Sequence, residues 1–193
     1  MSDASNGYDA LANAFLHARS SIGASSVREW AHTLGPGAHV LDVGCGHGFP
    51  ITEVLVAAGC QVSAIDASPA MLDVFRGRFP DVPVLCEPVQ SSAFFGRSFD
   101  GVVAWGLLFL LPAELQIDVI HKLGAAVAPG GQLLFTSPLR PCEWLDAMTG
   151  LGSRSLGADA YRRAIESSGL TLLREFDDEG DNHYYVAARA RQP

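Results

Sequence analysis

One short stretch, residues 40–50, constrains the fold of this chain more than any other. Residues 40–43 form a mostly apolar run rich in β-branched side chains, which is typical of a buried strand. Three glycines follow at alternate positions, and Pro50 stands where the first turn of a helix would begin. The stretch therefore predicts a strand, a tight glycine turn and a helix. Such a turn lets a ligand lie directly on the backbone, with the N–H groups of the helix start directed at it.

The spacing of the glycines distinguishes between two kinds of nucleotide-binding turn. Asp42, Gly44, Gly46 and Gly48 fill the pattern acid-x-Gly-x-Gly-x-Gly. The dinucleotide fingerprint needs Gly-x-Gly-x-x-Gly instead, and Phe49 stands where its third glycine would be. The observed pattern resembles motif I of the class I S-adenosylmethionine (SAM)-dependent methyltransferases.

A second acidic residue follows at the distance that such a motif needs. Residues 61–65 predict the second strand, and Asp66 ends it roughly 20 residues after the glycine turn, the spacing expected for an acid that binds ribose hydroxyls. Ser68 and Pro69 then begin a helix as N-cap and first helical residue. The string over residues 65–72 is similar to the second motif of many small-molecule methyltransferases. A plain helix-capping role is the alternative for Asp66.

The remaining chain predicts the alternating strands and helices of a doubly wound α/β fold. Helices are expected over residues 8–19, 27–34, 51–58, 69–79, 112–127 and 158–168. Further strands are expected over residues 82–86, 99–104, 132–136, 170–176 and 184–188, and residues 137–157 are expected to be irregular. Asp100 is expected at the amino end of its strand, in a structural role.

The resemblance also implies how these elements are arranged in space. It implies a Rossmann-like, seven-stranded, mostly parallel sheet in the order 3-2-1-4-5-7-6, whose last strand is antiparallel. It also implies a single domain, in which residues 1–34 form a helical lid and residues 35–193 form the SAM-binding core. The resemblance further implies that this lid, which precedes the first strand, lies over the cofactor and the substrate.

The same resemblance implies the cofactor contacts. Asp66 would bind the ribose, Glu87 the adenine, and Tyr8 and Arg19 the methionine carboxylate. A structural tyrosine and a solvated arginine are the alternative for the last two. The expected cofactor-binding residues are Tyr8, Arg19, Asp42, Gly44, Cys45, Gly46, Gly48, Asp66, Ala67, Met71, Glu87, Val89 and Ala104.

Methyl transfer from a sulfonium requires alignment of donor and acceptor, exclusion of water and, for some acceptors, removal of a proton. A cationic sulfonium favours aromatic walls. The candidate substrate-binding residues are Trp105, Trp144 and Tyr184, and packing in the core is the alternative for the two tryptophans. His183 is the candidate general base and Asn182 or Asp181 its orienting partner, with a structural histidine as the alternative. No metal site is expected, because the other histidines have no companion ligands.

The composition and the absence of certain motifs restrict the class of molecule that the chain can act on. The net charge is −8 and the arginines are scattered, whereas a nucleic-acid-binding surface would show a basic stripe. Residues 104–107 read Ala-Trp-Gly-Leu, not the Asn/Asp-Pro-Pro-aromatic motif of enzymes that methylate the amino groups of adenine and glutamine. The Pro-Cys of cytosine C5-methyltransferases would lie in the same loop, but Pro141–Cys142 follows the fifth strand. We therefore expect a small-molecule acceptor and no nucleic acid.

Other features favour a cytoplasmic protein. No apolar run is long enough for a membrane span, and the N-terminal residues lack the segments of a signal peptide. The four cysteines are far apart and are expected to be reduced thiols. We therefore expect no membrane partner, and the oligomeric state stays open.

The sequence thus predicts a methyltransferase that uses SAM and yields S-adenosylhomocysteine (SAH). Two other classes stay open. One is a non-catalytic SAM-binding protein or sensor. The other is an NAD-dependent oxidoreductase, which would need a different glycine spacing and a Tyr-x-x-x-Lys motif that the chain lacks. The acceptor atom, whether O, N, S or C, cannot be read from the sequence.

Overall fold

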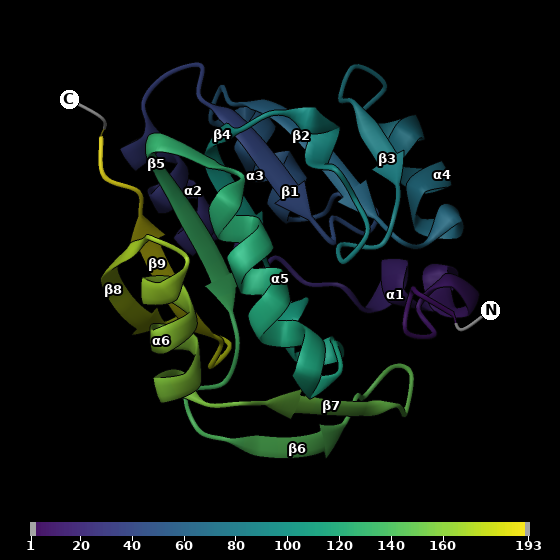
Figure 1. Ribbon diagram of the computed structural model, residues 1–193. Helices are drawn as coiled ribbons and strands as arrows, with labels where there is room; N and C mark the ends of the chain where they lie inside the picture. The colour runs from purple at the N-terminus through teal and green to yellow at the C-terminus, as the bar shows by residue number, and fades with distance from the viewer. Residues whose placement is uncertain (1–2, 192–193) are drawn as a thin grey trace.

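A computed structural model of the chain describes residues 3–191, and a seven-stranded sheet forms its centre (Figure 1). The strands lie in the order β3-β2-β1-β4-β5-β9-β8. They are β1 (His39–Val43), β2 (Gln61–Asp66), β3 (Val84–Cys86), β4 (Phe99–Ala104), β5 (Val127–Thr136), β8 (Thr171–Asp177) and β9 (His183–Ala188). The pairs among β1 to β5 are parallel, and β9 runs antiparallel to both β5 and β8. β6 and β7 form a separate hairpin, so β8 and β9 are the sixth and seventh strands of the main sheet. The expected order 3-2-1-4-5-7-6 is therefore confirmed.

Helices cover both faces of this sheet (Figure 1). They are α1 (Ala12–Ala18), α2 (Ala24–Leu34), α3 (Ile51–Ala57), α4 (Pro69–Arg78), α5 (Ala113–Ala125) and α6 (Ala158–Ser167), with short 3₁₀ turns η1 (Asp9–Leu11), η2 (Phe94–Gly96) and η3 (Leu108–Leu110). Alternating residues of the strands face opposite layers. On β1, Leu41 packs in the cluster formed with α5 and α6, whereas Val40 packs in the cluster formed with α2 and α3. The sheet therefore lies between apolar cores on its two faces.

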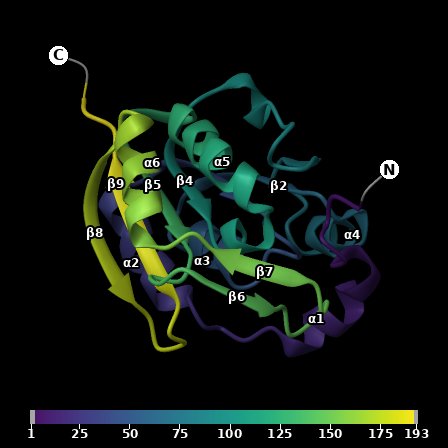
Figure 2. The same ribbon diagram turned by 60° about the horizontal axis from the view of Figure 1, so that its bottom comes forward.

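The expected irregular region, residues 137–157, was wrong in part, because it contains a hairpin of β6 (Cys142–Leu145) and β7 (Gly152–Ser155). Its strands hold no β-branched residue, so propensity gave no signal. The tip is held by Asp146, whose Oδ1 accepts hydrogen bonds from the N–H groups of Met148 and Thr149 at 3.0 and 2.8 Å. Figure 2 shows the hairpin lying outside the main sheet, with its tip beside α1.

Several element boundaries also differ from expectation. The expected helix over residues 8–19 is divided into η1 and α1, because Leu11 leaves helical geometry at φ −109° and ψ 9°. The expected helix over residues 112–127 ends at Ala125, and β5 begins at Val127, which pairs with Phe99. The expected N-cap is confirmed, since the Ser68 hydroxyl accepts a hydrogen bond from the N–H of Met71 at 3.1 Å. Among the described residues, no helix has the length and apolar character that crossing a membrane requires.

Candidate active site

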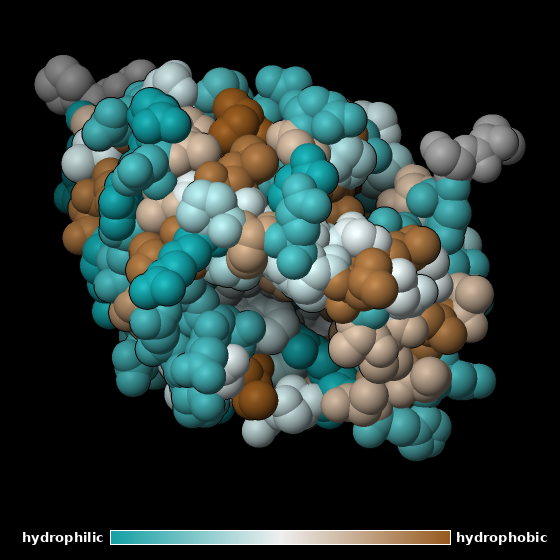
Figure 3. All heavy atoms as spheres, turned by 90° about the horizontal axis from the view of Figure 1, so that it is seen from below, coloured by the Kyte–Doolittle hydropathy of each residue, from teal (hydrophilic) through white to brown (hydrophobic). Residues whose placement is uncertain are grey.

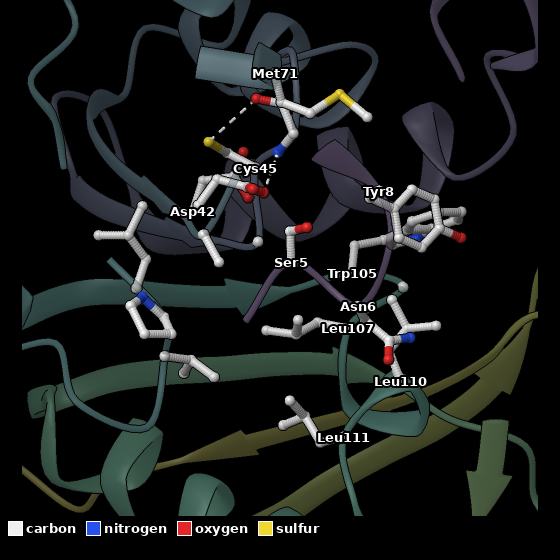
Figure 4. A pocket seen from close by; sticks show the side chains of 18 of the residues that line it. Ser5, Asn6, Tyr8, Asp42, Cys45, Met71, Trp105, Leu107, Leu110 and Leu111 are labelled. Carbon is white, nitrogen blue, oxygen red and sulfur yellow. Dashed lines mark hydrogen bonds between the residues drawn. The ribbon is translucent and has the colours of Figure 1, made fainter. Parts of the chain in front are cut away.

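A cavity of about 320 Å³ lies at the carboxyl ends of the parallel strands. Figure 3 views this face of the molecule, which is hollowed near its centre. Figure 4 shows Asp42, Cys45 and Met71 on one side of the cavity and Leu107, Leu110 and Leu111 on the other. Its wall includes most residues expected at the site, namely Tyr8, Arg19, Asp42, Gly44, Cys45, Gly46, Asp66, Ala67, Met71, Glu87, Val89, Trp105 and Asn182. The volume is in the range of sites for small molecules and cofactors.

The glycine turn and Asp66 form one hydrogen-bonded unit in this wall. The Gly44 N–H donates to the Ile65 carbonyl at 2.9 Å, which fixes the turn to the end of β2. The Asp66 carboxylate accepts from the N–H groups of Gly46 and Ser68, both at 2.8 Å. Each of its two oxygens thus holds one backbone donor and keeps a lone pair for a ligand. Burial raises the pKa of Asp66, and the backbone N–H groups of Ser68, Gly46 and Ala67 oppose that shift.

Asp42 lies in β1, just before the glycine turn, and is hydrogen-bonded to α3. Its side chain is only 1% exposed, and its carboxylate accepts a hydrogen bond from the Thr52 hydroxyl at 2.6 Å. Burial raises the pKa of Asp42 to about 7, and the nearby Asp66 adds to the shift. The residue is therefore a titrating group in the neutral range.

Replacing Asp42 with asparagine is expected to flatten the pH dependence of stability. A pKa of about 7 in the folded chain lies above the ordinary unfolded value of about 3.9. The stabilisation is full below about pH 4 and is lost as the pH rises through about pH 7, because the unfolded chain ionises first. Between about pH 5 and pH 8 the wild type should therefore lose about 3 kcal/mol more than Asp42→Asn. Urea unfolding at both pH values measures this, and equal losses in the two proteins would refute the assignment.

A chain of polar contacts links Arg19 in the cavity wall to the turn between β8 and β9. The Arg19 guanidinium lies 4.1 Å from the centre of the Trp105 ring, whose Nε1 donates to the Tyr184 hydroxyl at 2.6 Å. That hydroxyl donates to Asp178 at 2.8 Å, and Asn182 Nδ2 also donates to Asp178. Within residues 3–191, no carboxylate lies in ion-pair distance of Arg19. Burial lowers the pKa of its guanidinium, so the site holds a half-buried cation that makes no ion pair within the described residues.

The N-terminal segment lies over the cavity and contacts two other elements. The Tyr8 hydroxyl donates to Asp146 Oδ2 in the tip of the β6–β7 hairpin at 3.0 Å. The Asp9 carboxylate accepts from the Ser68 hydroxyl at 2.7 Å and from the Ala70 N–H at 2.9 Å, at the start of α4. These contacts join parts of the chain that are far apart in sequence. Sequence reasoning missed Asp146 and Asp9, and the run of turn-forming residues around Asp146 was the only local signal.

Six expected site residues lie outside the wall of this cavity, one of them Asp181, the alternative orienting partner. Gly48 faces Phe79 and Phe75, and Ala104 is buried in the core. Tyr184 stacks on Phe176 with 4.7 Å between ring centres. The other two are Trp144, which lines a second cavity described below, and His183.

His183 is held by acidic neighbours instead of facing the cavity. The ring is 7% exposed, with Nδ1 2.6 Å from Asp177 and Nε2 3.6 Å from Glu175. Asn182 lines the cavity, but its Nδ2 is bonded to Asp178. The general-base role of His183 and the orienting role of Asn182 stay predictions. Within residues 3–191, no three His, Cys, Asp or Glu side chains gather as a metal site needs.

Comparisons with known proteins agree with this geometry. A family model described as a methyltransferase domain matches residues 40–131. A ubiquinone biosynthesis O-methyltransferase of Xanthomonas campestris pv. campestris (strain B100) is 35% identical over 146 residues, which cover 70% of this chain and 59% of that protein. The chain thus spans about three-fifths of the length of this curated relative.

Solved structures share the fold at low sequence identity. Magnesium protoporphyrin IX methyltransferase from Synechocystis PCC 6803, with bound SAM, has a TM-score of 0.71 at 18% identity, covering 86% of this chain and 78% of that one. The SAM-bound amino pentose methyltransferase CalS10 from Micromonospora echinaspora has a TM-score of 0.70 at 19% identity, covering 86% and 90%. Residues 40–131, which hold the glycine turn and Asp66, thus match a methyltransferase domain, in a chain whose fold is that of solved SAM-bound methyltransferases.

Proposed function

We propose that this chain transfers a methyl group from SAM to a small-molecule acceptor and releases SAH. The observation that carries the proposal is the joint position of Asp66 and the glycine turn, which are bonded to each other in the wall of one cavity. An acid at the end of the second strand, beside a turn without side chains, suits the ribose and the adjoining chain of an adenosyl compound.

The adenosine half of SAM fits the side of the cavity near β2 and β3. Asp66 has one lone pair on each carboxylate oxygen for the two ribose hydroxyls. Ile65, Met71 and Val89 offer apolar surface for a purine ring, and Glu87 offers a carboxylate for its amino group. At Gly46 an added Cβ would meet no atom closer than 3.8 Å, so the turn leaves open space on its cavity side.

The methionine half fits the opposite side of the cavity. The unpaired Arg19 guanidinium suits a carboxylate, and Tyr8 lies on the same wall. Trp105, over which Arg19 stacks, adds an aromatic surface suited to a cationic sulfonium. The cavity thus offers a matching group to each end of SAM.

SAM, when bound, supplies a methyl group whose C–S bond breaks as the acceptor atom bonds to the carbon. The residues of the chain contribute alignment and exclusion of water, which provide most of the rate enhancement in such a displacement. Tyr8 and Asp146 close the cavity over the reacting groups through their hydrogen bond. No histidine lines the cavity within the described residues, so this proposal includes no histidine base.

The acceptor and the location of the protein belong to the same proposal. The relative is named for O-methylation in ubiquinone biosynthesis, and the solved neighbours for a porphyrin and an amino pentose. Their names share a small-molecule acceptor, which supports that class of acceptor for this chain, with no nucleic acid or membrane partner.

Four free cysteines, two of them exposed, support a cytoplasmic location.

A transfer assay tests the activity. The protein is incubated with SAM carrying a labelled methyl group and a panel of phenols, amines and thiols. We expect label in one class of acceptor, with SAH formed in equal amount. Binding of SAH without transfer to any acceptor would contradict the proposal and favour the non-catalytic SAM-binding alternative.

Replacing Arg19 with glutamine is expected to weaken SAH binding about ten- to a hundredfold, because a charge-assisted hydrogen bond is lost. The matched ligand is 5′-methylthioadenosine, which lacks the carboxylate, and its affinity should be unchanged. Calorimetric titration of both ligands measures the difference. Equal weakening of the two ligands would place Arg19 in a purely structural role.

A further inference from the structure

A second cavity, of about 520 Å³, lies between the hairpin and the start of α5. It shares Asn6, Leu110 and Leu111 with the cofactor cavity, so the two spaces meet at these three side chains. Figure 4 shows Asn6 beside Leu110, on the side of the cofactor cavity that faces Leu111. A molecule in the second cavity therefore lies next to the proposed cofactor site.

Two residues that line this cavity each carry a buried polar atom with no partner among residues 3–191. The Ser153 side chain is 2% exposed and its Oγ makes no hydrogen bond. Asn6 Nδ2 is also buried and unbonded, and its residue has a positive φ of 52°. Two residues along the same strand, the Ser155 hydroxyl is satisfied by the Pro138 carbonyl at 2.7 Å. Because an unpaired buried polar group is costly, its persistence at a cavity wall points to a ligand that supplies the partner.

The rest of the wall sets the character of that ligand. Trp144 packs against Phe109 with 5.3 Å between ring centres, and Leu110, Leu111 and Pro112 add apolar surface. The charged residues of the wall are Glu114, Glu143 and Arg154, and Arg154 is paired with Glu143 at 2.8 Å. One carboxylate is thus left without a cation in the wall, which disfavours an anionic ligand.

We propose that the second cavity binds the body of the methyl acceptor, an uncharged and mostly apolar molecule that carries a hydroxyl or carbonyl oxygen. That oxygen accepts a hydrogen bond from Asn6 Nδ2 or from the Ser153 hydroxyl. The reacting group of the acceptor extends past Leu110 and Leu111 into the cofactor cavity. This inference rests on the proposed function, since it assigns the acceptor site of the same reaction.

Three sets of fragments of similar size test the proposal by ligand-observed NMR: neutral phenols and aryl ketones, benzoates, and benzylamines. Each set is measured with and without saturating SAH. The variants are Ser153→Ala, which removes the hydroxyl, and Asn6→Asp, which replaces the donor at nearly constant size and tolerates the positive φ. Ser155→Ala is the matched control, because Ser155 lies in the same strand, is similarly buried and does not line the cavity.

We expect the neutral fragments to bind most tightly, with affinity about three- to tenfold weaker in Ser153→Ala and in Asn6→Asp and unchanged in Ser155→Ala. Tighter binding of benzoates, no binding of neutral fragments, or equal affinity in all variants would overturn the inference. Failure of SAH to bind would contradict the proposed function instead, and the arm without SAH still tests the cavity. Thermal melting confirms that each variant is folded.

Discussion

Replacing Asp66 with alanine is expected to reduce the affinity for SAH at least about a hundredfold. The carboxylate is proposed to accept both ribose hydroxyls, and hydrogen bonds to a charged group contribute about 1.5–3 kcal/mol each. The variant also removes the acceptor for the N–H groups of Gly46 and Ser68, which loosens the turn beneath the ligand. Calorimetric titration with SAH measures the loss.

The control for this variant is Asp100→Ala. Asp100 accepts a hydrogen bond from the His39 N–H at 2.9 Å and does not line the cavity. It is expected to cost some stability and to leave the affinity for SAH unchanged. An Asp66→Ala protein that binds SAH within about tenfold of the wild type would leave the ribose assignment without support.

Replacing Gly48 with alanine is expected to lower the free energy of unfolding by about 3 kcal/mol. Gly48 has φ +86°, and an added Cβ would lie 2.4 Å from the Phe79 ring and 3.1 Å from the Phe75 ring. The substitution therefore combines backbone strain with overpacking, and urea denaturation measures the sum.

Gly59→Ala separates the two contributions. Gly59 has a similar φ of +80°, but an added Cβ would meet no atom within 4 Å. This control should cost only the backbone strain, about 1 kcal/mol. Equal losses in the two variants would show that Phe79 moves aside freely and that packing does not fix a glycine at position 48.

The parts of the site that could be predicted from the sequence are those determined by neighbouring residues. The strand, the glycine turn and the following helix lie within residues 39–57, and their pattern contains its own start and end signals. Asp66 ends the adjacent parallel strand, so the topology alone brings it beside Gly46. Ser68 and Pro69 mark the start of α4 in the same local way.

The parts that escaped prediction depend on contacts between distant segments. Tyr8 meets Asp146 only because the hairpin extends to the N-terminal segment, and nothing local to either residue specifies that meeting. His183 follows a polar turn at the expected end of the sheet, yet Asp177 and Glu175 hold its ring outside the cavity. Gly48 fits the motif pattern, but what excludes a side chain there is its positive φ together with the ring of Phe79, the C-cap residue of α4.

The most direct test of the central claim is calorimetric titration of the wild-type chain with SAM, SAH and NAD. We expect SAM and SAH to bind at about micromolar concentration, with a heat that the Asp66→Ala variant does not show. Binding of NAD without binding of either adenosyl compound would contradict the account, and the cavity would then belong to a different class of enzyme.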